Sequence, residues 1–121
     1  MLEIQREYND EYIVYDFIGS INTTDLKVVQ KMLREDISKT YAFIFSFRYL
    51  NYIDMDAVEM LEEVYLLGIN NACEMIVCSL NPQPAMMLEV FQTDKMYTIK
   101  KSLKDAKDMF EGEDYEALYY S

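Results

Sequence analysis

The sequence predicts an α/β domain built on an open, mixed β-sheet of four to five strands with about four helices. Two observations support this class. Two strand-like segments at the N-terminus are separated by a short polar turn, and beyond them apolar strand-like segments alternate with segments of helical periodicity. Such alternation is typical of parallel strands joined by right-handed helical crossovers. We therefore expect an N-terminal antiparallel hairpin followed by a parallel centre.

The N-terminal hairpin is predicted from residues 2–6 and 12–18, which are rich in β-branched, aromatic and other apolar residues. Asn9 and Asp10 lie between these segments and favour a turn. Gly19 is expected to end the second strand. The opening of the chain is therefore predicted as two paired strands.

The remaining elements follow from the change between strand-like and helical periodicity. They are expected, in order, as a helix capped by Thr23 or Thr24, a strand at 41–45, a helix from Asp54 to Gly68 or Asn70-Asn71, a strand at 75–78, a helix from Pro84, a short strand at 96–99 and a helix capped by Ser102. The strands at 41–45 and 75–78 are nearly continuous apolar runs, as is typical of strands buried on both faces. We expect residues 1–110 to form a single domain and residues 111–121 an acidic C-terminal tail.

Composition restricts the classes of function. The 121 residues carry 22 acidic and 11 basic side chains, for a net charge of −11, and they include no histidine. This charge disfavours binding to nucleic acid and to anionic membrane surfaces. The lack of histidine removes the commonest general base and metal ligand. Because no apolar run approaches the roughly 18–20 residues of a membrane helix, we expect a cytoplasmic protein without direct membrane insertion.

The stretch YIDMDAVEML, residues 52–61, places Asp54 and Asp56 where an extended segment changes into a helix. A helix cap followed by a negative charge in the first turn explains both residues without chemistry. A Mg²⁺ site would need further oxygen ligands, and no other part of the sequence is evident as their source. An acid–base pair is disfavoured because side chains two apart on a helix point about 200° away from each other. We therefore expect no catalytic, cofactor-binding or metal-binding residue, and no enzyme activity.

The segment FSFRYLNYIDMDAVEML, residues 45–61, resembles the STAS domain family, which includes the bacterial anti-sigma-factor antagonists. In that family a buried strand ends in Asp-Leu-Ser-Gly-Val, and three residues later Asp-Ser-Ser-Gly-Leu opens a helix. Ser46 stands at the first family Asp and Asp54 at the second, with identical spacing. Residues 19–22, Gly-Ser-Ile-Asn, are similar to the family's Gly-Glu-Leu-Asp. The resemblance covers about residues 2–110.

The resemblance implies a non-enzymatic regulatory module that binds other proteins. In the antagonists, the first Ser of Asp-Ser-Ser-Gly is phosphorylated by a partner kinase that is also the anti-sigma factor. Met55 occupies that position here, Asp56 replaces the second Ser, and Ala57 replaces the Gly. A thioether cannot accept a phosphoryl group, so the usual switch is expected to be absent at this position.

The resemblance also implies where a partner binds and which classes of partner to expect. The predicted contact residues lie in the turn at Ser20 and Asn22, at the helix start, and in the loop after β-strand 75–78; they are Ser20, Asn22, Asp54, Met55, Asp56, Ala57 and Ser79. The expected partner is an anti-sigma factor of the serine kinase type or another regulatory protein. Self-association through the hairpin edge stays open. The alternatives are an accessory subunit of a transporter and a STAS protein that binds a small ligand or nucleotide.

Overall fold

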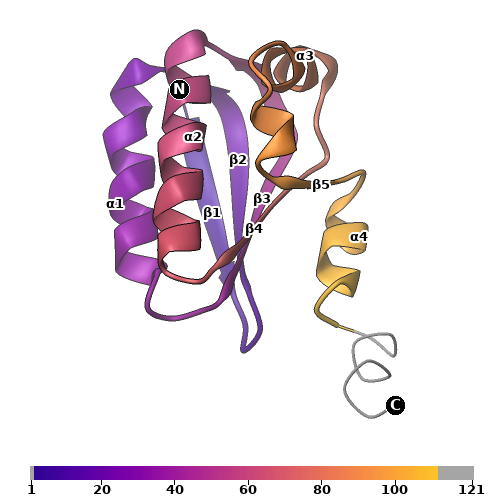
Figure 1. The fold of residues 1–121 in the computed structure, drawn as a ribbon. Helices are drawn as coiled ribbons and strands as arrows, with labels where there is room; N and C mark the ends of the chain where they lie inside the picture. Colours follow the sequence, from indigo (N-terminus) through magenta and orange to yellow (C-terminus); the bar gives the residue numbers. More distant parts are fainter. Residues whose placement is uncertain (1, 112–121) are drawn as a thin grey trace.

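The structure is a computed structural model that describes residues 2–111 (Figure 1). Within this range, five strands form one sheet in the order β1-β2-β3-β4-β5. The strands are β1 (Leu2–Tyr8), β2 (Ile13–Ile21), β3 (Ala42–Ile53), β4 (Glu74–Cys78) and β5 (Thr98–Lys100). β1 pairs antiparallel with β2, and all other neighbours pair parallel. The predicted mixed sheet with an N-terminal hairpin and a parallel centre is confirmed.

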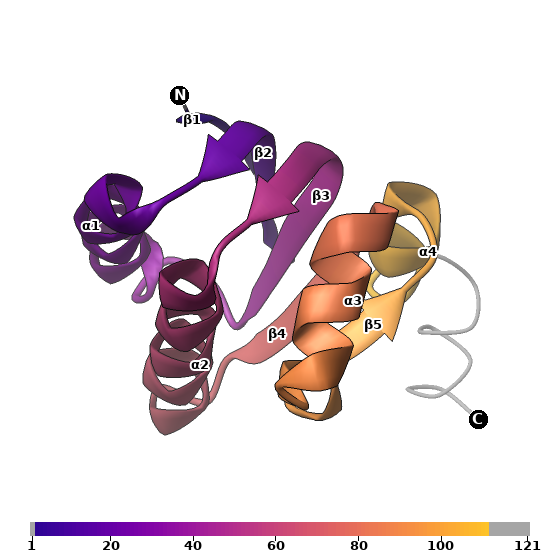
Figure 2. The same ribbon diagram turned by 90° about the horizontal axis from the view of Figure 1, so that it is seen from above.

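Four α-helices are present in the described part of the chain: α1 (Leu26–Asp36), α2 (Met55–Asn70), α3 (Pro82–Val90) and α4 (Leu103–Asp108). Short 3₁₀ turns precede α1 and β5. Helices α1, α2 and α3 cover one face of the sheet, and α4 lies on the other face (Figure 2). None of the helices within residues 2–111 is long and apolar enough to cross a membrane.

Alternating side chains of the central strands build a separate core on each face of the sheet. The larger core lies under α1, α2 and α3 and contains a cluster of fully buried aromatic rings, which are those of Tyr15, Phe17, Phe43, Phe45 and Phe47. The smaller core lies under α4 and uses the alternate positions of β2, β3 and β4, including Val14, Ile44 and Ile76. Because successive strand residues point to opposite faces, both layers follow from one sheet that is buried on its two sides.

The ends of two predicted strands are wrong by three residues or more. β3 does not end near residue 45 but continues to Ile53, and its second half pairs with the end of β2. Gly19 does not end β2; it lies inside that strand beside a register shift, with a φ of 106° that favours glycine. Beyond these register shifts the two strands stay paired and run to the same end of the sheet.

The long second half of β3 is held by side chains from the start of α3. β4 ends at Cys78, opposite Ser46, so within residues 2–111 the rest of β3 has no partner strand on that side. The Gln83 side chain takes that place, because its amide nitrogen donates to the Ile53 carbonyl and its oxygen accepts from the Ile53 amide, both at 2.9 Å. Asn81 Nδ2 also donates to backbone carbonyls of this segment. Backbone groups that lack a strand partner are thus satisfied by two side chains.

A buried carboxylate ties the hairpin to the end of α1. Asp36 is 0% exposed and accepts hydrogen bonds from four side chains. The donors and their distances are Tyr15 Oη at 2.6 Å, Tyr8 Oη at 2.9 Å, and Arg6 and Lys39 at 3.1 Å each. Burial of a charged group is tolerated only where such partners replace its hydration. Asp36 therefore links β1, β2 and α1 at one point.

Candidate functional site

The ends of β2 and β3 bring six of the seven predicted contact residues to one end of the sheet. In the register of these strands, Ser20 lies opposite Tyr52 and Ile21 opposite Ile53. Asn22 and Asp54 directly follow these paired strand ends, so the two residues lie at the same end of the sheet. Parallel strands generally present their carboxyl ends to one edge, where ligands of open α/β sheets commonly bind.

Asp54 caps α2, as predicted. Its backbone is extended, with φ −100° and ψ 179°, and its Oδ1 accepts a hydrogen bond of 2.8 Å from the Ala57 amide. Asp56 follows in the first turn, where the helix dipole favours a negative charge. Ala57 is fully buried and belongs to the core, so its side chain is not available to a partner. The two acids shape the start of the helix and leave Met55 between them at the surface.

The turn after β2 is organised by Asn22 rather than by a threonine cap. Asn22 Oδ1 accepts from the Thr24 amide at 3.0 Å and from the Thr24 hydroxyl at 2.7 Å. The N-cap residue of α1 is Asp25, without a side-chain cap bond, so the prediction that Thr23 or Thr24 caps this helix is wrong. A 3₁₀ turn at Thr23–Asp25 precedes the helix and shifts its start.

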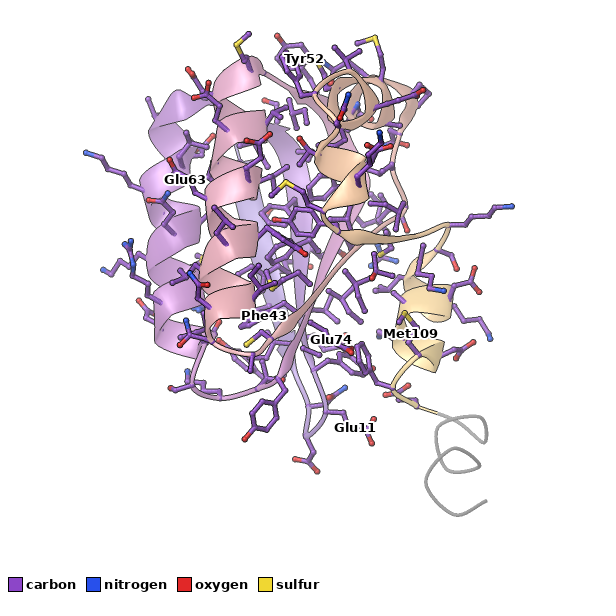
Figure 3. All side chains as sticks on the ribbon, viewed as in Figure 1. Glu11, Phe43, Tyr52, Glu63, Glu74 and Met109 are labelled. Atoms are coloured by element: carbon purple, nitrogen blue, oxygen red, sulfur yellow. The ribbon has the colours of Figure 1, made fainter. Side chains whose placement is uncertain are left out.

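Exposed apolar side chains accompany these polar residues. The exposed fraction is 54% for Tyr52 and 51% for Met55. Figure 3 places Tyr52 at the end of the molecule where α2 begins, with Phe43 and Glu74 toward the opposite end. Tyr52 was not predicted as a surface residue, because the strand was predicted at residues 41–45, well before this position. Leu50 and Ile53 are buried while Asn51 and Tyr52 between them are exposed, so the segment does not follow strand alternation and periodicity carried no signal for Tyr52.

Ser79 lies apart from the other predicted contact residues. β4 ends opposite Ser46, whereas β3 continues for seven more residues to Ile53, so the loop at Ser79 starts well below the level of Asp54. The Ser79 amide donates to the Lys100 carbonyl, which places this residue beside β5. Gln83, in the first turn of α3 after this loop, is the residue that reaches the end of β3.

Replacing Asp54 by Ala is expected to lower the free energy of unfolding by about 0.5–2 kcal/mol, because the Ala57 amide loses its acceptor. Urea denaturation followed by circular dichroism measures the change. Asp54→Asn is the matched control, since asparagine is an equally good cap, and it should lose at most a few tenths of a kcal/mol. An equal loss in both variants would mean that the carboxylate charge, and not the cap bond, supplies the stability.

The comparisons with known proteins agree with the resemblance in residues 45–61. One similar solved structure is an anti-sigma factor antagonist from Mycobacterium paratuberculosis, with 14% sequence identity and a TM-score of 0.80; the match covers 91% of this chain and 94% of that chain. Another is a putative anti-sigma factor antagonist from Thermotoga maritima, with 11% sequence identity and a TM-score of 0.79; the match covers 88% of this chain and 93% of that chain. A third is the Bacillus cell fate determinant SpoIIAA in its phosphorylated form, with 19% sequence identity and a TM-score of 0.72; the match covers 90% of this chain and 100% of that chain. At these identities the likeness shows a shared fold.

Comparison with curated protein sequences gave no match. The model of one protein family, described as the STAS domain, matches residues 3–106. That match includes all of the strands apart from Leu2, the first residue of β1, and it includes the segment from Ser46 to Ala57 on which the resemblance rests. Since it spans nearly the whole of the described structure, the chain belongs to the STAS domain family.

Proposed function

We propose that this protein is a non-enzymatic regulatory module that binds a protein partner, in the manner of an anti-sigma-factor antagonist. The proposed contact residues are Ser20, Asn22, Tyr52, Met55 and Asp56, which together we call the helix-start surface. The observation that carries the proposal is the exposure of Tyr52 and Met55, by 54% and 51%, where β2 and β3 end together. Tyrosine and methionine are enriched in protein interfaces, and methionine adapts to the shape of a partner.

The partner we propose is a cytoplasmic regulatory protein, such as an anti-sigma factor. Membership of the STAS family and the similarity in fold to anti-sigma-factor antagonists support a protein partner in general. The acidic surface of the chain, with a net charge of −11, favours a partner whose contact surface is basic. The five contact residues include one acid and no base, which agrees with that preference.

Binding at this surface is proposed to occur without phosphorylation. Met55 stands at the position where the resemblance places the phosphorylated Ser of the antagonists, and its thioether has no hydroxyl to modify. Asp56 next to it supplies one negative charge, whereas a phosphoserine carries close to two and offers three acceptor oxygens. The helix start therefore has a fixed charge in place of one that a kinase adds and a phosphatase removes.

Tyr52→Ala is expected to weaken partner binding at least about fivefold, because tyrosine is enriched among the interface residues whose truncation costs more than about 1 kcal/mol. Wild type and variant serve as parallel baits in lysate of the source organism, and the recovered partner is then purified and titrated by calorimetry. Tyr41→Ala is the matched control: Tyr41 is 79% exposed but lies just before β3, at its opposite end. Equally weakened partner binding in the two variants, or unchanged binding in both, would contradict the proposed surface.

The recovered bait gives two further readouts. A transcriptional regulator as partner supports the antagonist-like role, whereas an ATPase of a transporter would replace it by the accessory-subunit alternative. The intact mass of the bait reports phosphorylation, and a stoichiometric phosphoryl group on Ser20, Thr23 or Thr24 would contradict binding without phospho-control.

A further inference from the structure

A groove opens at the end of the molecule opposite the helix-start surface, where the hairpin turn meets the starts of β3 and β4 and the end of α4. Its volume is about 450 Å³, within the range of roughly 300–1,000 Å³ that is typical of ligand sites. Figure 3 places two of its lining residues, Glu11 and Glu74, at the opposite end from Tyr52. The groove shares no residue with the helix-start surface.

Hydrogen bonds within the chain hold the rim of this groove in place. In the hairpin turn, Asn9 Oδ1 accepts a hydrogen bond of 2.9 Å from the Glu11 amide. The Glu74 amide donates to the Tyr41 carbonyl at 2.7 Å, which joins the start of β4 to the start of β3. The groove is therefore built by the fold itself, and a ligand that enters it does not bear the cost of ordering its walls.

Aromatic and acidic side chains line the groove, and no basic side chain does. The acids are Asp10, Glu11 and Glu74, the aromatic residues are Tyr41 and Phe110, and two alanines complete the lining. Within residues 2–111, none of the three carboxylates forms an ion pair, and Tyr41 is 79% exposed. A cation that enters the groove would therefore meet unpaired carboxylates beside aromatic rings.

We propose that this groove docks an arginine side chain presented by a segment of a protein partner. A guanidinium group stacks on aromatic rings and donates paired hydrogen bonds to a carboxylate, so it uses both kinds of side chain in the lining. A lysine ammonium is a compact, strongly hydrated charge that makes neither the planar stack nor the paired bonds. The docking of arginine here is independent of the proposed function, because the two surfaces lie at opposite ends of the molecule.

The charge of this chain disfavours its own segments as the occupant of the groove. Residues 112–121, which lie outside the described part of the chain, contain three acids and no base, and a second copy of the whole chain carries a net charge of −11. Like charges brought together across an interface cost free energy. A basic segment of another protein is the occupant whose charge complements the three carboxylates.

The test titrates the ¹⁵N-labelled chain with the peptide Gly-Arg-Gly-Arg-Gly, blocked at both ends, up to millimolar concentration and follows the amide shifts by NMR. We expect the largest shift changes at residues 10–11, 41–42, 72–74 and 110, and a Kd at least about threefold weaker for the peptide with lysine in place of arginine. Glu74→Gln should weaken the Kd of the arginine peptide about threefold, because one exposed carboxylate is lost. Glu63→Gln removes an exposed carboxylate of α2 that does not line the groove; it is the matched control and should leave this Kd unchanged.

Three results would overturn the proposal. The first is that the arginine peptide causes no shift changes at millimolar concentration, or causes them away from the groove. The second is that the lysine peptide binds as tightly as the arginine peptide. The third is the same Kd in Glu74→Gln as in Glu63→Gln.

The peptide-free spectra test the other occupants. Groove amides whose shifts change with protein concentration alone would identify a second copy as the occupant, and nuclear Overhauser contacts between the groove and residues 112–121 would identify that segment; either result overturns the proposal. Tyr41→Ala separates this groove from the helix-start surface: it should weaken the arginine peptide at least about threefold and leave unchanged the affinity of a partner bound at the helix start. An unchanged Kd for the arginine peptide in this variant would contradict the stacking of the guanidinium on Tyr41.

Discussion

Replacing Asp36 by Ala is expected to lower the free energy of unfolding by about 3–5 kcal/mol, the range for breaking a buried charged network. The variant leaves four donors without their shared acceptor, and one of them, the hydroxyl of Tyr15, is fully buried. Leaving a buried donor unsatisfied costs more than an ordinary hydrogen bond contributes. Urea denaturation at neutral pH measures the loss.

Glu35→Ala is the matched control for this experiment. Glu35 precedes Asp36 in α1, but its side chain is 48% exposed and its only recorded ion pair within residues 2–111 is a contact of 3.7 Å with Arg6. Surface ion pairs contribute at most about 1 kcal/mol. A loss in Asp36→Ala no larger than the loss in Glu35→Ala would show that the four-donor arrangement is not a stabilising feature.

The same carboxylate gives the stability a defined pH dependence. Burial by itself raises the pKa of Asp36, but hydrogen bonds from Tyr15, Lys39, Tyr8 and Arg6 outweigh burial and lower this pKa below its ordinary value of 3.8. A lowered pKa in the folded state stabilises the fold above the unfolded-state pKa, and this contribution is lost as the pH falls through the folded-state pKa. The difference in unfolding free energy between wild type and Asp36→Asn should therefore shrink below about pH 4. A constant difference between pH 7 and pH 3 would contradict this assignment.

Replacing Phe45 by Ala is expected to cost about 3–5 kcal/mol, because it removes a fully buried ring from the larger core. Phe45 lies at the centre of the aromatic cluster, with ring centroids at 5.5 Å from Tyr15, 5.7 Å from Phe17 and 6.2 Å from Tyr97. The cavity would have a wall of rigid rings, which limits relaxation around it. Denaturant unfolding should show a lower midpoint with an unchanged slope.

Two comparisons make the Phe45 result specific. Phe91→Ala removes the same ring from a position that is 39% exposed and should cost much less. Phe45→Leu keeps most of the buried volume and should recover part of the loss. A cost below 1.5 kcal/mol for Phe45→Ala would mean that the surrounding rings collapse into the space, contrary to the rigid packing proposed here.

The sequence by itself determined the elements of this protein and their order. The apolar run Tyr12-Ile13-Val14-Tyr15 and the helical spacing after Asp54 are local patterns, and local patterns were sufficient to predict the hairpin, the strands and the helices. The caps at Asp54 and Ser102 were also predictable, since each side chain binds an amide only three residues away. The spacing between Ser46 and Asp54 was sufficient to indicate the family.

The tertiary structure decided the features that depend on contacts between distant segments. β3 extends to Ile53 because it pairs with the end of β2 and because Gln83, thirty residues later, binds its backbone. Asp36 is buried because side chains from β1 and β2 reach it across the sheet edge. The same applies to Ser79, which the register of β4 separates from Asp54. Periodicity reports which face a residue occupies, whereas strand register and long-range hydrogen bonds are fixed only when the whole sheet assembles.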